Sequence, residues 1–282
     1  MYRLLAVSII LILALSGCGK KKEPLANPDA IKAAGIGQKI LQFELTAYTD
    51  RGVKRWEVKG ESANVVDEVV ELKNVIATTY RQDTTLTLEA DEGFYNRVSS
   101  KVHLEKNVVV TTGDGGRLLT DALDWDSKNN IITTDKPVLI KRQEINLWGT
   151  GAKGEPELKK AQFVKHIKIE MDKGATHIIC DGPLDIDYEN NVAFFNDNVR
   201  ITDEKGEITS DKLDAYLNPQ TKTIVKAIAR GRVKILRNEN YSYSDEAIYL
   251  AESHKVILTG RPRIVIYPDE KFDASFFGDK NE

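Results

Sequence analysis

Residues 118–130 read LLTDALDWDSKNN, and ninety residues further on, residues 208–220 read ITSDKLDAYLNPQ. Both stretches carry a small hydroxyl residue, an aspartate, an apolar residue two places on, an aromatic and a polar turn. Their aspartates belong to a longer series whose intervals lie near 30 or 60: Asp91, Asp121, Asp181, Asp211 and Asp245. A period near 30 indicates stacked supersecondary units that bury their apolar faces only against one another.

Two further features follow the same period. A small residue precedes each aspartate of the series: Ala90, Thr120, Cys180, Ser210 and Ser244. An apolar-x-apolar run also recurs, led each time by Asn, Pro or Gly-Arg: Asn74, Asn107, Pro137, Asn198, Gly231 and Gly260. We expect the aspartates to accept backbone N–H bonds at strand entrances and so to fix turns. The alternative is a row of catalytic or metal-binding carboxylates, which we favour less because catalytic pairs occur once and not every 30 residues.

Short runs of alternating apolar and polar residues fill the chain from Leu41 onward, as in Val199-Arg200-Ile201 and Val233-Lys234-Ile235. This period of two is typical of strands with one buried face. Polar clusters at 113–116, 127–130, 189–191, 203–206 and 218–221 are typical of hairpin turns. The sequence therefore predicts an all-β, largely antiparallel solenoid of stacked units of about 30 residues.

The first eighteen residues differ from the rest. A positive start is followed by an apolar stretch from Leu4 to Leu15, and then by Leu15-Ser16-Gly17-Cys18. This order resembles a bacterial lipobox and predicts a signal peptide at 1–18, with Cys18 as the lipidated first residue of the mature chain. The alternatives are an ordinary secretory signal or a short uncleaved anchor. Residues 19–40 are expected to form a flexible tether, and 269–282 a polar tail.

Composition and motifs exclude several functions. The formal net charge of −3 lacks the basic excess expected of a nucleic-acid partner. The GxSxG, HExxH, CxxC and GxxxxGK[ST] motifs are missing, and the four histidines lack the spacing of metal ligands. We therefore expect no enzymatic activity, no cofactor and no metal. If Cys18 is acylated, Cys180 is left without a disulfide partner and is expected to be a small buried residue.

The order of motifs in residues 41–152 resembles the LptC family of lipopolysaccharide export. The matching lines are FELTAYTDRGVKRWEVKG (43–60), ADEGFY (90–95), NVVV (107–110), LTDALDW (119–125), TDKPV (134–138) and GTG (149–151). Residues 176–267 resemble the related LptA/OstA module. The matching lines there are NVRI (198–201), TSDKL (209–213) and GRVKI (231–235).

The resemblance implies two continuous β-jellyroll domains, an LptC-like one at 41–155 and an LptA/OstA-like one at 156–268. Each would have an open groove between two facing sheets that holds the acyl chains of lipopolysaccharide. The implied partners are an inner-membrane LptB2FG-type ABC transporter and an LptA-type periplasmic bridge protein. LptC proteins typically carry a membrane helix, whereas this chain carries a lipobox. We therefore expect a periplasmic lipoprotein of a Gram-negative bacterium, held on the inner membrane rather than the outer.

Alternation also predicts which side chains face the groove, because a polar neighbour that points out turns its flanking residues in. The predicted groove residues are Leu86, Leu88, Phe94, Val102, Leu104, Val108, Val110, Trp125, Val138, Ile140, Val199, Ile201, Val233 and Ile235. The same register places Ile264 and Ile266 inside, and Phe194 is a further candidate for filling or gating the groove. A closed, dry core is the alternative arrangement of these residues.

Two other functions remain open at this stage. The chain could be an envelope assembly lipoprotein that pairs with an outer-membrane barrel and carries no lipid. It could also be a β-solenoid enzyme that acts on polysaccharides through the aspartate series. The second is disfavoured because the alternating runs lack the aromatic side chains that sugar rings stack on. Of the three tryptophans, only Trp125 and Trp148 lie in the repeat register.

Overall fold

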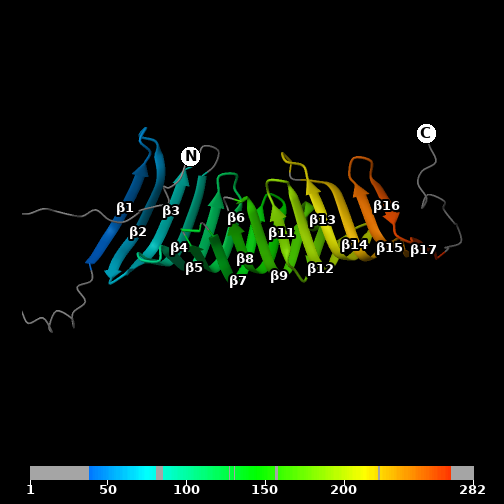
Figure 1. Cartoon of the computed structure of the whole chain (residues 1–282), viewed down its shortest axis with the longest axis horizontal. Helices are drawn as coiled ribbons and strands as arrows, with labels where there is room; N and C mark the ends of the chain where they lie inside the picture. The colour runs from blue at the N-terminus through cyan, green and yellow to red at the C-terminus, as the bar shows by residue number, and fades with distance from the viewer. Residues whose placement is uncertain are drawn as a thin grey trace, which may run out of the picture. The chain divides into compact units, whose positions relative to one another are not determined.

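A computed structural model describes residues 38–80, 85–126, 128–129, 131–155, 158–221 and 223–267. The predicted signal peptide, Cys18, residues 19–37 of the predicted tether and the predicted tail lie outside these residues. Strand β1 begins at Gln38, so residues 38–40 are strand and not tether. Within the described residues, seventeen β-strands and a single 3₁₀ turn account for the regular structure (Figure 1). The prediction of an all-β, antiparallel fold is confirmed.

The chain divides into two compact units, which are residues 1–143 with 151–158, and residues 144–150 with 159–282. The first unit contains β1 (Gln38–Tyr48), β2 (Lys54–Val66), β3 (Val69–Tyr80), β4 (Thr85–Asn96), β5 (Lys101–Thr112), β6 (Arg117–Asp126) and β7 (Ile131–Arg142). Each of these strands pairs antiparallel with the next along the chain. Strand β8 (Ile145–Glu155) contributes residues to both units.

The second unit repeats this plan with two interrupted strands. It contains β9 (Lys160–Met171), η2 (Asp172–Gly174), β10 (Thr176–Cys180), β11 (Leu184–Asp187), β12 (Val192–Asp203), β13 (Gly206–Leu217), β14 (Ile224–Arg237), β15 (Asn240–Leu250), β16 (Lys255–Thr259) and β17 (Arg263–Val265). Strands β10 and β11 both lie between β9 and β12 and act as two halves of one strand. Strands β16 and β17 pair in the same way with the two halves of β15.

Most of the long strands are bent near their middle. Two consecutive residues with positive φ form the bend in β5 (Lys106, 65°, and Asn107, 53°) and in β12 (Asp197, 62°, and Asn198, 54°). The pairing register shifts at these points, as expected of β-bulges. The bends divide each unit into two arms. The first arm contains the residues that precede the bend in β5 and β12, together with their cross-strand partners, and the second arm contains the residues that follow it and their partners.

The bends correct one sequence interpretation. The Asn, Pro and Gly-Arg residues were expected to lead strands, but Asn74, Asn107, Pro137, Asn198 and Gly231 lie inside β3, β5, β7, β12 and β14. Only Gly260–Arg261 separates two strands, β16 and β17. Asparagine and glycine are the residue types that adopt the left-handed conformation most readily, which explains why they recur where strands bend.

The predicted turns join the strand ends as expected. Asp126 and Asp187 each accept two backbone N–H bonds from the following turn, at 3.0 to 3.1 Å. Asn96 and Asn218 do the same at 2.8 to 3.0 Å. These four residues also lie about 30 or 60 apart, so they form a second periodic series that performs the turn-fixing role expected of the first.

The core of each unit lies along its bends. In the first unit, Leu104 before the β5 bend and Val108 after it belong to one buried cluster with Val75, Ala90 and Leu123. The two arms of a strand therefore turn one face toward a common core. In the second unit the most buried large side chains lie at the corresponding places: Ile167, Leu184, Val199, Leu213 and Val233.

Candidate functional site

Cross-strand pairing defines a continuous inner face on the second arm of the first unit. Leu88, Val110, Leu118 and Ile140 are successive partners on β4, β5, β6 and β7. Partners in an antiparallel pair point to the same face of the sheet. One row nearer the bend, Val108 and Val138 flank Thr120. An apolar wall thus runs across four strands.

The first arm supplies the facing wall. Leu104 pairs with Gly93 and Leu123 in the row next to the bend. Val102 pairs with Tyr95 and Trp125 in the following row, and Ile132 continues that row on β7. The indole N–H of Trp125 is buried without an acceptor among the described residues, so only apolar packing holds this ring.

Burial on both walls decreases with distance from the bend. Val108 next to the bend is 1% exposed, and Leu104 and Val138 are also buried. Leu88, Val102 and Val110 lie one row further out and are only partly buried, while still packing against the core cluster. Leu86, Trp125 and Ile140 are partly buried as well. The structure thus brings the predicted first-unit residues other than Phe94 onto common walls that are closed along the bend and less covered away from it.

The second unit carries an isoleucine row in the same position. Ile178, Ile201, Ile208 and Ile235 are cross-strand partners on β10, β12, β13 and β14. Ser242 and Ile264 extend this row across β15 and β17. Ile264 therefore has the predicted orientation but is 40% exposed, since β17 is a terminal strand. Val199 and Val233 lie in the next row and are 1% exposed, as the alternation predicted.

Two predicted aromatic residues have the wrong orientation. Phe94 pairs with Glu71 and with His103, so it lies on the outer face and contacts the His103 ring at 6.3 Å between centroids. Phe194 pairs with Asp185 and Asp214 on the outer face of the second unit and is 37% exposed. In each case the residue that follows, Tyr95 or Phe195, occupies the inner face.

Alternation alone could not have avoided these two errors. Phe94-Tyr95 and Phe194-Phe195 are aromatic pairs, and alternation leaves open which member points in. The structure resolves both: Tyr95 pairs with the inner residue Val102, and Phe195 lies two positions before the first bend residue of β12, as the inner residue Leu104 does in β5.

The aspartate series fixes bends and not turns. Asn107 donates to Asp91 at 2.7 Å, and Asn198 donates to Asp181 at 2.6 Å. The guanidinium of Arg232 donates to Asp211 at 2.7 Å. In each case the donor is the second bend residue of the following strand, and Arg261 donates in the same way to Asp245 at 3.3 Å. The expectation of backbone N–H partners was therefore wrong for these four carboxylates.

The small residues before the aspartates are explained by the same bends. All five are buried against the inside of the fold: Ala90, Thr120, Cys180, Ser210 and Ser244. The hydroxyls donate to nearby backbone carbonyls, as Thr120 does to Pro137 and Ser210 to Lys212, both at 2.9 Å. Burial raises the pKa of the Cys180 thiol to about 11, so the thiol stays protonated at neutral pH.

The described residues show no arrangement typical of metal or membrane-spanning sites. No group of three or more His, Cys, Asp or Glu side chains within them is placed to hold a metal ion. No helix in the same part of the chain is long and apolar enough to cross a bilayer. The inner walls are lined by aliphatic side chains, so the ligand that they suit is apolar.

Two protein families match successive ranges of the chain. The family described as "Lipopolysaccharide-assembly, LptC-related" matches residues 4–172, more than half of the chain. The chain belongs to the LptC-related family. A second family, described as "LptA/(LptD N-terminal domain) LPS transport protein", matches residues 183–280. No curated protein matches the chain.

Membership in the LptC-related family gives the chain its general role. Proteins of the two matched families act in lipopolysaccharide transport in the periplasm of Gram-negative bacteria, and they are not enzymes. The chain thus combines an LptC-related region with an LptA-like region in one polypeptide.

Proposed function

We propose that this LptC-related chain accepts lipopolysaccharide from an inner-membrane LptB2FG-type ABC transporter and passes it toward the outer membrane. The acyl chains would lie between the two inner walls of each unit. The observation that carries this proposal is the gradient of burial, in which rows of aliphatic side chains are sealed along the bend and partly uncovered beyond it. A closed core would bury the inner-face rows far from the bend as completely as those next to it.

The physical need for such walls follows from the cost of exposing acyl chains to water. Each exposed CH₂ costs about 0.8 kcal/mol, so a chain of roughly 14 carbons costs on the order of 10 kcal/mol. A lipid with several chains would not cross an aqueous compartment unaided. Rows such as Leu88–Val110–Leu118–Ile140 repeat similar side chains from strand to strand, which keeps the affinity similar along the path.

We further propose that the partners join at the terminal strands. Among the described strands, β1 pairs only with β2, and β16 and β17 pair only with β15. Ile40 and Leu41 on β1, and Val256 and Ile257 on β16, are exposed. Open, apolar strand edges are suited to pairing with another chain's strand. An LptA-type bridge protein would pair at one of these edges.

The anchor and the domain limits belong to the same proposal. Cleavage before Cys18 and acylation of its thiol would hold the chain on the inner membrane, near the transporter. The LptC-like domain would comprise residues 41–155 and the LptA/OstA-like domain residues 156–268. Labelling with a radioactive fatty acid tests the anchor, because Cys18→Ala should abolish incorporation while the chain is still made.

The central test places a photoreactive residue at Val110 in living cells and probes for lipopolysaccharide. We expect a lipid adduct that requires cellular ATP. Ile140→Glu should abolish the adduct, because a charge on an apolar wall carries a large desolvation cost. Leu139→Glu is the matched control, because residue 139 is adjacent to Ile140 in sequence and points to the outer face. This variant should leave the adduct intact.

The opposite result would favour the other function considered for the sequence. Crosslinks from position 110 to protein only, with no lipid in either ATP-replete or ATP-depleted cells, would indicate an assembly module that carries no lipid. An adduct of equal strength in Ile140→Glu and Leu139→Glu would remove the inner walls from the transport path.

A further inference from the structure

An aromatic and cationic cluster occupies the outer face of the second unit, on the second arm. Lys234, Tyr243 and Arg263 are direct cross-strand partners on β14, β15 and β17. Their side chains therefore lie on one face, about 5 Å apart from strand to strand. Tyr241 and Tyr267 adjoin them. We call these five residues the tyrosine–cation cluster.

The members of the cluster contact one another closely. The Lys234 ammonium lies 4.6 Å from the centre of the Tyr241 ring, and the Arg263 guanidinium lies 4.8 Å from that of Tyr243. Tyr241 stacks beside Tyr243 and meets Tyr267 edge-on, each at 6.3 Å between centroids. Tyr267 is 60% exposed. The contacts order two cations beside three phenol rings at the surface.

Neither cation is neutralised by an acidic neighbour. Among the described residues, no carboxylate lies within ion-pair distance of Lys234 or Arg263, although the strands around them are rich in acids. The nearby carboxylates are engaged elsewhere, Glu207 by Arg200 at 3.1 Å and Asp245 by Arg261 at 3.3 Å. The two positive charges are therefore available to an anion from outside.

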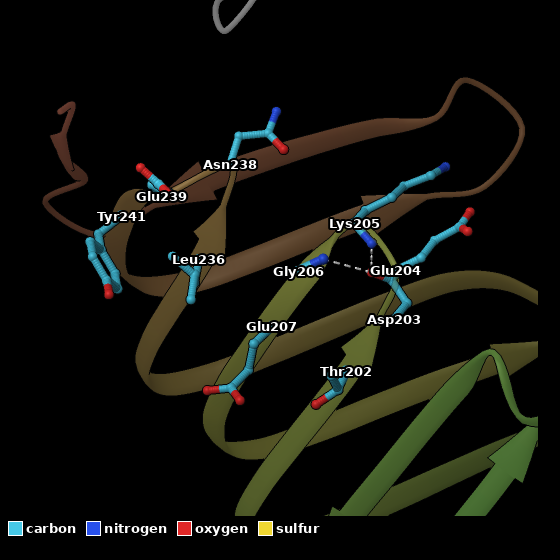
Figure 2. A pocket seen from close by; sticks show the side chains of 10 residues that line it. All are labelled: Thr202, Asp203, Glu204, Lys205, Gly206, Glu207, Leu236, Asn238, Glu239 and Tyr241. Atoms are coloured by element: carbon cyan, nitrogen blue, oxygen red, sulfur yellow. Dashed lines mark hydrogen bonds between the residues drawn. The ribbon is translucent and has the colours of Figure 1, made fainter. Parts of the chain in front are cut away.

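A polar hollow of about 570 Å³ adjoins the cluster at the hairpin ends of β12–β13 and β14–β15. Figure 2 shows Thr202, Glu207, Leu236 and Tyr241 following one another across the four strands, with Asn238 on the β14–β15 turn. The rest of the lining includes Lys205 and three further carboxylates, Asp203, Glu204 and Glu239. Carboxylates accept hydrogen bonds from sugar hydroxyls, and hydroxyl and amide groups both accept and donate them, so the hollow suits the uncharged ring of a saccharide and not its anionic substituent. Tyr241 belongs to both the hollow and the cluster.

We infer that the cluster and the hollow together bind an acidic saccharide. The hydroxyl-rich ring would lie in the hollow against Tyr241, and a carboxylate or phosphate substituent would be bound by Lys234 and Arg263. Charge-assisted hydrogen bonds from a guanidinium and an ammonium suit such a group. Aromatic rings with a polar tip provide a surface for the less polar face of a sugar.

The position of the cluster suggests that the saccharide is that of the transported lipopolysaccharide. This identification of the ligand rests on the proposed function. Lys234 and Ile235 are consecutive on β14 and point to opposite faces, so the cluster lies on the back of the wall formed by the isoleucine row. The β14–β15 turn at Asn238 and Glu239 is the rim between the two faces. A lipid with chains against Ile235 would bring its saccharide over this rim and onto Tyr241.

The test measures binding of the full-length chain to the acidic oligosaccharide obtained by removing the acyl chains from lipopolysaccharide. Titration calorimetry of the double variant Lys234→Gln, Arg263→Gln should show affinity reduced by about tenfold or more, because two charged hydrogen-bond donors are lost. The matched control is Arg117→Gln, Lys141→Gln. These two are cross-strand partners on the outer second arm of the first unit. The control loses the same charge and should bind as the wild type does.

Further arms separate the ligand's chemistry and the two hypotheses. Dephosphorylated oligosaccharide should bind more weakly than the intact one, and inorganic phosphate alone should compete poorly, since it lacks the ring. Equal competition by phosphate, or equal binding by wild type and the Lys234/Arg263 variant, would overturn the saccharide site. If that happened while Ile140→Glu still abolished the lipid adduct, the transport proposal would stand and only this inference would fall. Oligosaccharide binding that depends on the cluster, with a lipid adduct indifferent to Ile140→Glu, would uphold the site and overturn the transport proposal.

Discussion

The inner faces of the two units carry similar rows of residues, whereas their outer faces differ. On the second arm, the inner row is aliphatic in both, Leu88–Val110–Leu118–Ile140 in one and Ile201–Ile208–Ile235 in the other. The outer row on the same strands is Glu89–Val109–Leu119–Leu139 in the first unit. In the second it is Arg200–Thr209–Lys234–Tyr243–Arg263.

This contrast indicates that the inner and outer faces answer to different requirements. Both units must close along their bends, and both are proposed to receive the same acyl chains, so one pattern serves twice. The outer faces have no such common task. A row of three aliphatic residues and one glutamate in one unit and a cationic, aromatic row in the other are suited to different contacts. Substitutions in the two units test whether their similar inner faces also contribute similarly to stability.

The largest effect is expected from truncating the two cores at matched positions. Leu123 in the first unit and Leu213 in the second are both buried next to a bend. Either Leu→Ala change should lower the free energy of unfolding by about 2–5 kcal/mol, through lost burial and the cavity that remains. Urea unfolding followed by circular dichroism measures this, with the exposed Val98→Ala as a control near zero. A small loss at Leu213 alone would show that the second core tolerates cavities that the first does not.

The bends should respond differently to the loss of glycine. Gly231 has φ of +77°, and a Cβ there would lie 2.9 Å from the Asp211 Cβ. Gly231→Ala should therefore cost about 1–3 kcal/mol in unfolding free energy. The first bend residue of β5 in the first unit, Lys106, adopts φ of 65° with a side chain in place. Lys106→Ala should therefore cost under about 1 kcal/mol, through the loss of its exposed ion pair with Glu92 at 3.0 Å.

The double variant Gly231→Ala, Asp211→Gly, compared with Asp211→Gly alone, separates steric crowding from backbone strain, because glycine at 211 removes every side-chain atom that the new Cβ would meet. Recovery of part of the lost stability in thermal melts would assign that part to the contact with Asp211. An unchanged loss would assign all of it to the left-handed backbone conformation.

A smaller effect is expected from the side chains that lock the bends. Asn107→Ala removes the donor to Asp91, and Arg232→Ala removes the donor to Asp211. Each should cost about 1 kcal/mol or less, because the bonds are exposed. Chemical unfolding in low and high salt distinguishes the two, since the charged Arg232 pair should weaken with salt and the Asn107 bond should not.

Much of this fold could be predicted from the sequence because alternation and turn chemistry are local signals. Val199-Arg200-Ile201 assigns its own inner and outer residues, and the clusters at 113–116 and 218–221 mark turns through residue types that favour them. The period near 30 also indicated stacked units. These inferences need no knowledge of which strands pair.

The bends could not be predicted in the same way, because they depend on the neighbouring strand. Asn107 and Asn198 were interpreted as strand entrances, since asparagine before an alternating run is a common turn signal. Only pairing reveals that each donates to an aspartate 16 or 17 residues earlier and lies within a continuous strand. The tyrosine–cation cluster was missed for a similar reason, as Lys234, Tyr243 and Arg263 come together only through the register of three strands.

The smallest expected effect concerns another outer row that differs between the units. His103 in the first unit lies where Phe194 lies in the second, and its Nδ1 is 2.7 Å from Asp124 Oδ1. The hydrogen bond to Asp124 raises the pKa of His103 above its usual value near 6.5, and Glu105 acts in the same direction. A raised pKa in the folded state adds stability that is complete below the unfolded value and is lost as the pH rises through the folded one.

His103→Phe gives this row the residue found in the second unit and should remove that pH dependence. The unfolding free energy of the wild type minus that of the variant should be larger at about pH 5.5 than at about pH 8.5. The change in this difference should be under about 0.5 kcal/mol, because the pair is half-exposed. NMR titration of the His103 ring measures the cause directly, and Asp124→Asn should lower its midpoint toward the ordinary value. If Asp124→Asn left the His103 titration midpoint unchanged, the outer rows that contain His103 and Phe194 would differ in side-chain shape and not in charge.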